Sequence, residues 1–420
     1  MARVVITTWG SFGDVNPYLG LATALRARGH VPVMAMPSFY GTTVRDAGFA
    51  FAAVEPDADP ALDPALVRKV MDPRRGTEAI FREILLPHLP AAHATLMAAV
   101  QGADCMITHP AALAAPIVAE QTGIPWLSTV LSPLTFMSAY DPILPPPATW
   151  VRHLPWWVLR KTAPWVADAG RRVTSRWMEP LQEFRASLGL PRAIHPIFDG
   201  QHSPYGTLAL YSKVFGGPFA DWPQQVTITG QLRYDVSHGA VLSPEIERFL
   251  DAGDAPIVFT LGSSVVLIAE QFWDECLDAT RRMGGRAILL AGPVQSARLQ
   301  SRVSSNVLVV DAAPHSLLFP RAAAIVQPCG IGTTGTALAS GRPQLAVPYT
   351  NDQPDNAWRL CRLGVARMMS PRAYRGRAVA RELTTLLSAP GYREQAEALA
   401  AVVASERGAE LACDRIEALL

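Results

Sequence analysis

The sequence has no excess of charge of either sign. Lysine and arginine together number 37, against 36 aspartates and glutamates, and only 17% of the 420 residues are charged. Surfaces that bind nucleic acid are strongly basic, so this balance argues against a nucleic-acid partner. Hydrophobic residues make up 49% of the chain, which is enough to build large cores and excludes an intrinsically disordered protein.

Cysteine is scarce as well, and long apolar runs are missing. The five cysteines are scattered and form no CxxC pair, so we expect neither a metal site nor a disulfide framework, and a reducing, cytoplasmic compartment. No apolar run approaches the ~18–20 residues of a membrane span, and the amino-terminal apolar segment is too short for a signal peptide. The cysteines are Cys105, Cys276, Cys329, Cys361 and Cys413.

Short apolar runs alternate with helical segments along the chain. The continuous apolar run at 4–8 predicts a strand buried on both faces, as in a parallel sheet. A helix is expected at about 17–28, because its proline suits a first helical turn and Gly29 suits a C-terminal cap. A strand at 31–36 completes this βαβ unit, and the pattern restarts at 256–261. The sequence therefore predicts an α/β fold with two Rossmann-like, doubly wound domains.

The expected domain boundaries follow from one polar segment near the middle of the chain. Residues 231–242 are polar and contain a glycine, so we place the linker there. Residues 1–230 are then the amino-terminal domain and residues 243–395 the carboxy-terminal domain. We expect the last helices, at 396–420, to pack back on the first domain.

A glycine-containing turn, GSFGDVNP, follows the first predicted strand. It lies at the carboxyl edge of the sheet, where α/β folds bind ligands. Asp14 would stand at the mouth of a cleft there, and its carboxylate could take a proton from a bound hydroxyl. The same position fits equally well an aspartate that caps the following helix.

A second glycine-rich turn, at 330–335, reads GxGxxG and opens another predicted helix. Backbone amides at a helix N-terminus bind phosphate oxygens, and Asp352 follows about 20 residues later, as in the dinucleotide-binding fingerprint. A dinucleotide-dependent oxidoreductase is therefore one interpretation. Against it, the motif lies in the second domain, and Asp352 sits in a polar cluster, NDQPDN, that suits several sugar hydroxyls. A tight turn without any ligand is a third interpretation.

Three further loops are expected at the ligand edges of the two sheets. Ser263 lies in a strand-to-helix turn and His315 ends a strand of the second domain, while His109 ends a strand of the first. Each alone is a weak signal, but the GxGxxG turn and the loops of Ser263 and His315 lie on one edge, and together they indicate an elongated, phosphate-containing ligand.

An insert at 132–177 is rich in aromatic and flexible apolar side chains. Such residues suit a water-insoluble ring or acyl chain, although ordinary core packing or a patch that rests on a membrane surface fits the composition as well. From this insert and from the first-domain loop we select the acceptor-binding candidates His109, Phe136, Met137 and Tyr140.

Together these residues resemble the family 1 glycosyltransferases of the two-domain GT-B fold, whose domains face each other across a cleft. GSFGDVNP looks like the opening motif of sterol glucosyltransferases, antibiotic glycosyltransferases and the rhamnosyltransferase of rhamnolipid synthesis, and residues 312–360 look like the donor-binding block. The resemblance covers essentially the whole chain. It implies an inverting, metal-independent transfer of a hexose from a UDP- or dTDP-sugar, UDP-glucose by default, to a hydroxyl of an apolar small molecule. It implies no other cofactor.

The resemblance also implies a role for each matched residue. It makes Asp14 the general base and places the acceptor in the first domain and the donor in the second. His315 would lie near the nucleoside, and Thr333 and Thr334 would contact the diphosphate. Asp352 and Gln353 would bind sugar hydroxyls. The protein would be a monomer or a homodimer, with peripheral membrane contact left open. The donor-binding candidates are Ser11, Ser263, His315, Gln327, Cys329, Gly330, Gly332, Thr333, Thr334, Asp352 and Gln353.

Two of these residues depart from the family pattern, which usually has histidine and glycine at their positions. Gln327 can donate a hydrogen bond to the diphosphate but carries no positive charge. Cys329 adds a side chain where the phosphate approaches the backbone, and its place before a helix N-terminus predicts a lowered thiol pKa. The departures motivate a further alternative, a non-catalytic relative that assists a partner enzyme.

Overall fold

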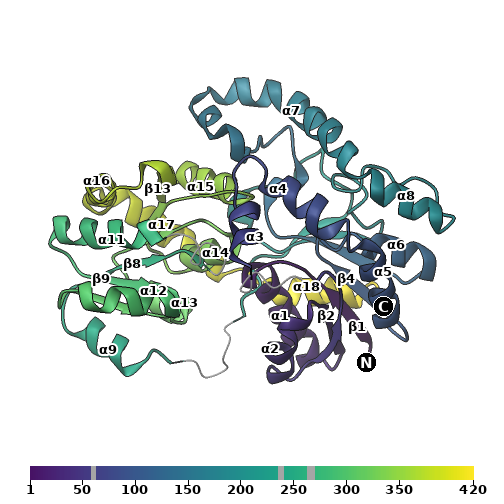
Figure 1. Ribbon diagram of the computed structural model, residues 1–420, viewed down its shortest axis with the longest axis horizontal. Coiled ribbons are helices and arrows are strands. Elements are labelled where there is room, and N and C mark those ends of the chain that lie inside the picture. Colours follow the sequence, from purple (N-terminus) through teal and green to yellow (C-terminus); the bar gives the residue numbers. More distant parts are fainter. Residues whose placement is uncertain (58–62, 235–240, 263–269) are drawn as a thin grey trace.

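The computed structural model describes residues 1–57, 63–234, 241–262 and 270–420. It contains two parallel sheets, each flanked by helices, which lie side by side in Figure 1. This arrangement confirms the predicted α/β fold with two doubly wound domains.

The first sheet has seven strands in the order β3-β2-β1-β4-β5-β6-β7, and all of its pairs are parallel. Val4 and Ile6 of β1 pack in one hydrophobic cluster, whereas Val5 packs in another on the opposite face. Both faces of β1 are therefore buried, as its continuous apolar sequence predicts. The strands are β1 (Arg3–Thr7), β2 (Val31–Met36), β3 (Ala50–Ala53), β4 (Cys105–Thr108), β5 (Trp126–Val130), β6 (Thr207–Ala209) and β7 (Val226–Ile228).

The helices of the first half surround this sheet and also extend beyond it. The α-helices are α1 (Phe12–Ala27), α2 (Gly41–Asp46), α3 (Pro64–Val70), α4 (Gly76–Ala79), α5 (Leu89–Ala99), α6 (Ala115–Thr122), α7 (Trp156–Trp177) and α8 (Glu179–Ser187). Shorter turns are η1 (Ser38–Tyr40), the π-helix η2 (Ile80–Leu85), η3 (Pro133–Phe136), η4 (Pro146–His153) and η5 (Lys213–Phe215).

The second sheet has six parallel strands in the order β10-β9-β8-β11-β12-β13. Its strands are β8 (Ile257–Thr260), β9 (Ala287–Leu290), β10 (Val307–Val310), β11 (Ala324–Gln327), β12 (Gln344–Ala346) and β13 (Ala366–Met368). The helices of this half are α9 (Pro244–Asp251), α11 (Glu270–Met283), α12 (Gly292–Leu299), α13 (His315–Leu318), α14 (Ile331–Ala339), α15 (Gln353–Arg362), α16 (Gly376–Ser388), α17 (Pro390–Ala404) and α18 (Gly408–Glu417), with the 3-10 turns η6 (Gln300–Arg302), η7 (Phe319–Arg321) and η8 (Pro371–Ala373).

The start of the first helix differs from its prediction. Helix α1 begins at Phe12, and Pro17 lies inside it rather than in its first turn. The reason is the cap: Ser11 accepts a hydrogen bond from Gly13 N, and the Asp14 side chain accepts one in return from Ser11 N. This capping box starts the helix five residues before the proline. The C-terminal end agrees with the prediction, because Gly29 follows the cap with a φ of 84°.

The last helix lies against the first domain. Ala412, Cys413 and Ile416 of α18 pack in the hydrophobic cluster that also contains β1 and α1. Arg28 Nη1 donates to Asp414 and Glu417 at 2.6 and 2.7 Å. The chain therefore crosses between the two domains twice. Among the described residues, none of the helices combines the length and apolar character needed to cross a membrane.

Candidate active site

The loop between β1 and α1 holds Asp14 in a fixed orientation. Asp14 Oδ2 accepts hydrogen bonds from Ser11 N at 2.8 Å and from Ser11 Oγ at 3.1 Å. Gly10 has a φ of 138°, and a Cβ at this position would overlap the Asp14 carboxylate, so the turn requires glycine. Asp14 is thus a helix-capping residue, and its second oxygen, Oδ1, remains directed toward the cleft.

His109 faces Asp14 from the end of β4. Its Nε2 lies 3.7 Å from Asp14 Oδ1, which is within ion-pair range but longer than a hydrogen bond. Its Nδ1 accepts a hydrogen bond from Ala111 N at 3.0 Å. Because Nδ1 accepts this hydrogen bond, the ring proton lies on Nε2, the nitrogen that faces the carboxylate.

A second carboxylate, Asp352, approaches the same space from the other domain. It directly precedes α15, and its Oδ2 accepts a hydrogen bond from Asn356 Nδ2 at 2.7 Å. Burial and, second, the negative charge of Asp14 together raise the pKa of Asp352 to about 7, against the lowering effect of the Asn356 hydrogen bond. The two aspartates therefore interact electrostatically across the cleft.

Between these residues lies a cavity of about 450 Å³ that both domains line. Its polar groups include Asp14, His109, Thr77 and Asp352, while most of its wall is apolar. The apolar side chains come chiefly from α3, η2 and the loops after β5 and α8: Leu66, Val67, Val70, Met71, Ile80, Phe81, Ile84, Leu85, Leu134, Met137, Ile197 and Phe198.

The segment from α3 to η2 lines this cavity and contacts the second domain, and Figure 1 shows α3 between the two halves of the molecule. Val67 and Met71 pack in the core cluster of the second domain. Thr350 Oγ1 donates to Asp72 O, and Thr77 Oγ1 donates to Asn351 Oδ1, each at 3.3 Å. Sequence reasoning missed this segment because it carries no motif, although the apolar residues of η2 recur at helical spacing.

Seven of the candidate residues line the cavity. They are Ser11, Asp14, His109, Met137, Gly330, Asp352 and Gln353. The amide of Gln353 is already engaged, since its Oε1 accepts a hydrogen bond from Tyr349 N at 2.9 Å. Gly332 lies close to this space, because a Cβ there would be 3.7 Å from Gly13 of α1. The N-terminal ends of α1 and α14 therefore contact each other where the two domains meet.

The two residues that depart from the family pattern are buried beneath the loop. Gln327 is fully buried, and its Nε2 donates to Gln344 Oε1 at 2.7 Å, so it is turned away from the cavity. Cys329 is also fully buried and packs with Val130 and Leu338. Burial raises the pKa of the Cys329 thiol well above its usual value, so the lowered pKa expected from the helix N-terminus is wrong.

The backbone at Cys329 gives a physical reason for glycine at this position. Its φ is 68°, in the left-handed region where a side chain is strained. The Cys329 carbonyl accepts a hydrogen bond from Asn356 Nδ2 at 3.0 Å, the same nitrogen that donates to Asp352. Cys329 therefore stabilises the loop through its backbone carbonyl, and its side chain does not contact the cavity.

Other candidates lie outside the cavity lining. Thr334 is fully buried, Thr333 is partly buried on α14, and His315 stacks on Phe319 with ring centroids 4.4 Å apart. Ser263 lies outside the described residues.

The three acceptor candidates of the insert lie in different environments. Met137 lines the cavity. Phe136 instead stacks between Trp222 and His202, at centroid distances of 4.0 and 5.6 Å, and packs against a core cluster. Tyr140 is 47% exposed. The geometry therefore does not bring Phe136 or Tyr140 to this cavity, because short 3-10 turns reorient the chain between neighbouring residues.

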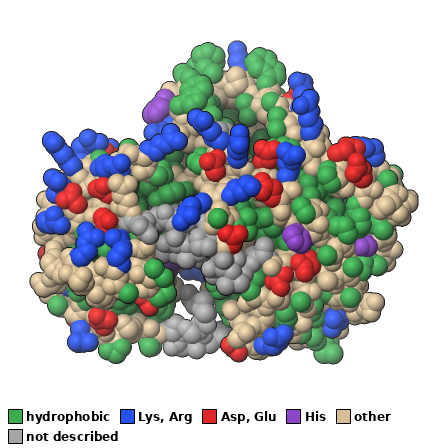
Figure 2. Space-filling view, viewed as in Figure 1, with side chains coloured by type: hydrophobic (Ala, Val, Ile, Leu, Met, Phe, Trp, Pro, Cys, Tyr) green, Lys and Arg blue, Asp and Glu red, His purple; other side chains and the backbone are tan. Residues whose placement is uncertain are grey.

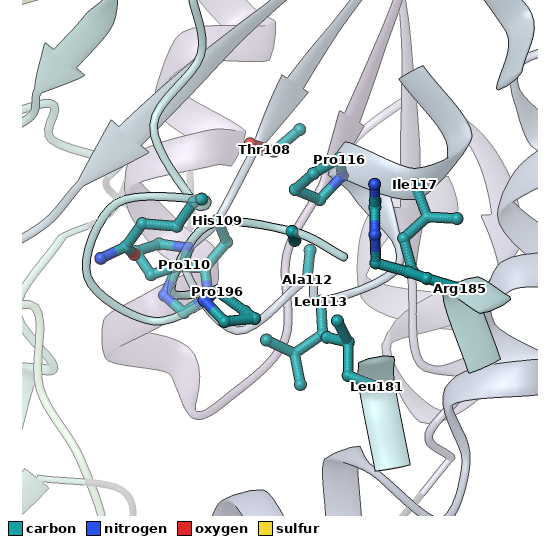
Figure 3. A pocket seen from close by; sticks show the side chains of 13 residues that line it. Thr108, His109, Pro110, Ala112, Leu113, Pro116, Ile117, Leu181, Arg185 and Pro196 are labelled. Atoms are coloured by element: carbon teal, nitrogen blue, oxygen red, sulfur yellow. The ribbon is translucent and has the colours of Figure 1, made fainter. Parts of the chain in front are cut away.

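A much smaller cavity, about 30 Å³, lies on the other side of the His109 loop (Figure 3). His109, Pro110 and Gln201 border both cavities. The small cavity has room for about one water molecule, which excludes a substrate. The candidate active site is the larger cavity, because Asp14, His109 and Asp352 line it.

Comparison with known proteins agrees with this geometry. Residues 4–140 match the model of the glycosyltransferase family 28 N-terminal domain, and residues 274–419 match that of the erythromycin biosynthesis protein CIII-like C-terminal domain. The chain is 32% identical to the O-mycaminosyltylonolide 6-deoxyallosyltransferase of Streptomyces fradiae, covering 99% of this chain and 97% of the relative. It is 30% identical to glycosyltransferase GtfE of Amycolatopsis orientalis, covering 98% of this chain and 96% of the relative.

Solved structures show the same fold. The glycotransferase of kitacinnamycin superposes with a TM-score of 0.73 at 20% identity, covering 100% of this chain and 99% of that one. Spinosyn rhamnosyltransferase SpnG complexed with thymidine diphosphate gives 0.71 at 16% identity, covering 99% and 100%. These comparisons assign the GxGxxG sequence to a transferase rather than to an oxidoreductase. The chain belongs to the GT-B glycosyltransferase family that includes the bacterial antibiotic glycosyltransferases.

Proposed function

We propose that this chain transfers a hexose, with inversion and without a metal, from a dTDP- or UDP-sugar to a hydroxyl of an apolar small molecule. The observation that carries the proposal is a mostly apolar cavity that Asp14 and Asp352 face from opposite domains. Three structural relatives have thymidine diphosphate bound, so dTDP-sugars are the first donors to test, ahead of UDP-glucose.

Asp14 is the group placed to activate the acceptor. Its Oδ2 is held by Ser11, which leaves Oδ1 to accept a proton from an acceptor hydroxyl. The acceptor oxygen then attacks the anomeric carbon from the face opposite the diphosphate, and the electron pair of the broken C–O bond goes to the diphosphate. Proton transfer to the Asp14 carboxylate balances the charge on the new glycosidic oxygen. His109, 3.7 Å away, can orient the carboxylate or the hydroxyl.

The donor groups come from the second domain. Amides at the N-terminus of α14, beginning at Ile331, are positioned to bind diphosphate oxygens and to stabilise the charge that develops on them. Asp352 can bind a sugar hydroxyl in either protonation state near neutral pH, because its pKa lies at about 7. A protonated Asp352 donates a hydrogen bond, and an ionised one accepts.

The test is a donor panel of dTDP-glucose, dTDP-rhamnose and UDP-glucose against a mixed library of macrolide, phenolic, terpenoid, sterol and lipid hydroxyl acceptors, read by mass gain. We expect one sugar mass to be added to at least one acceptor, and NMR of the product to show an inverted anomeric configuration. Asp14→Asn is the control. A folded protein that binds dTDP but transfers no sugar would favour the non-catalytic auxiliary alternative.

A further inference from the structure

Helix α7 exposes large aromatic side chains to solvent at the edge of the first domain. Trp157 is 63% exposed and Trp165 is 73% exposed, and Trp150, just before the helix, is 64% exposed. Figures 1 and 2 show this helix projecting at the top of the molecule, with hydrophobic side chains at its surface. Exposed patches that contain several large apolar side chains usually mark an interaction site.

Positive charge accompanies these tryptophans. Residues 150–177 contain five arginines and Lys161 but only one acidic residue, Asp168. Lys161 Nζ lies 5.7 Å from the Trp157 ring, one helical turn away, and Trp165 follows one turn later. Trp157, Lys161 and Trp165 therefore share the solvent-facing side of α7.

The inner side of α7 lies against the cavity. A Cβ at Gly170 would be 3.3 Å from Phe198 and 3.7 Å from Met137 Cε, and both of these residues line the cavity. A surface bound to the outer side of α7 is thus separated from the cavity by a single helix.

We propose that the outer side of α7 docks on an anionic lipid surface, from which an apolar acceptor reaches the cavity. Tryptophan prefers the boundary between headgroups and acyl chains, and lysine and arginine bind anionic headgroups. A second copy of the chain suits this face less well, because a symmetric dimer would place the basic side chains of the two copies against each other. The docking is argued from the exposed tryptophans and basic residues of α7 alone, whereas the route of the acceptor rests on the proposed function.

The test uses the full-length protein with vesicles of phosphatidylglycerol and phosphatidylcholine, measured by co-sedimentation. We expect binding that falls as salt rises and is at least 10-fold weaker to phosphatidylcholine alone. The double variant Trp157→Ala and Trp165→Ala should weaken binding at least 10-fold, and Arg160→Gln with Lys161→Gln should weaken it severalfold. Matched controls elsewhere are Tyr205→Ala, at a 47% exposed aromatic residue, and Arg281→Gln with Arg282→Gln on α11; both should bind like the wild type.

The proposal is overturned if the wild type does not bind anionic vesicles at low salt, or if the α7 variants and the controls bind equally. It is also overturned if gel filtration shows that the tryptophan variant changes only the oligomeric state. Sugar transfer to a water-soluble acceptor, measured without vesicles, keeps the two proposals distinguishable. Intact transfer without vesicle binding refutes the docking alone, and vesicle binding without transfer refutes the proposed function alone.

Discussion

Asp14 and Asp352 face the same cavity from the two domains, each in the N-terminal region of a helix, but their surroundings differ. Asp14 completes a capping box and accepts two hydrogen bonds from Ser11. Asp352 directly precedes its helix without a side-chain cap and accepts a hydrogen bond from Asn356. Burial and the charge of Asp14 raise the pKa of Asp352 to about 7.

The difference shows that the same residue type in a similar local position can serve two purposes. The capping box fixes the orientation of Asp14 and leaves one oxygen for the acceptor. Because Asp352 is buried, its charge state varies near neutral pH. Such a residue is better suited to binding a sugar hydroxyl than to acting as the general base. This division predicts that losing Asp14 affects turnover, whereas losing Asp352 affects donor affinity.

The largest expected effect is on turnover in Asp14→Asn. Asparagine can still accept the Ser11 hydrogen bonds through its amide oxygen, so α1 should keep its cap, but it cannot take a proton. Turnover at saturating donor should fall ~10²–10⁴-fold, the usual contribution of a positioned base. The dissociation constant for dTDP, measured by calorimetry, should stay within about twofold of the wild type. Near wild-type turnover would reduce Asp14 to a helix cap.

A smaller effect is expected on donor affinity in Asp352→Ala. The variant loses one hydrogen-bonding partner of the sugar and should bind the nucleotide sugar ~10-fold more weakly, the scale of one net hydrogen bond to a charged group. Free dTDP has no sugar to contact and should bind as before. Calorimetry with both ligands measures the difference. Equal losses for the two ligands would remove Asp352 from the sugar site.

The third prediction concerns stability and pH. The folded pKa of Asp352, about 7, lies above the ordinary value of 3.8, so between these values the folded chain holds a proton that the unfolded chain releases. The free energy of unfolding of the wild type should therefore fall as pH rises from about 4 to about 7. Asp352→Asn, which mimics the neutral acid, should be the more stable protein by roughly 1–2 kcal/mol at pH 8, with the gap shrinking toward pH 4.

Thermal melts from pH 5 to 8.5 measure this gap. The gap should also be smaller in an Asp14→Asn background, since the charge of Asp14 contributes to the raised pKa. A gap that does not change with pH would mean that Asp352 does not titrate in this window.

The smallest effect is expected at Cys329, on the loop beneath Asp352. Because the thiol is buried and its pKa is raised, alkylation by iodoacetamide should be slow, and dTDP should change the rate little. Peptide-mapped labelling rates, compared with the rapid rate in guanidinium chloride, provide the measurement. Rapid labelling that dTDP suppresses would indicate that the Cys329 sulfur lies at the diphosphate site.

Most of the fold follows from local sequence patterns. The predicted strand at 31–36 coincides with β2, and the one predicted at 256–261 contains β8. The start of α1 was misplaced because Pro17 is a conspicuous signal, whereas the capping box of Ser11 and Asp14 depends on a side-chain geometry that the sequence does not display.

The candidate site was predictable where a motif marks a strand end and not elsewhere. Asp14, Gly330 and Asp352 reach the cavity because parallel strands end at a common edge. Gln327 and Cys329 belong to the same motif, yet a left-handed backbone and a pair of buried glutamines turn their side chains inward. The wall from α3 to η2 depends on contacts between the domains, which no local pattern encodes.

The two chain crossings between the domains lie next to each other. A Cβ at Gly408 would be 2.9 Å from Gln231 O, and one at Gly230 would be 3.0 Å from Glu406 Cβ, so the outgoing and returning chains touch. Two adjacent connections leave the domains free to rotate about that corner while they resist sliding past each other. The α3 segment opposes this rotation, because its Val67 and Met71 pack in the core of the second domain, so wider opening of the cleft requires that contact to separate.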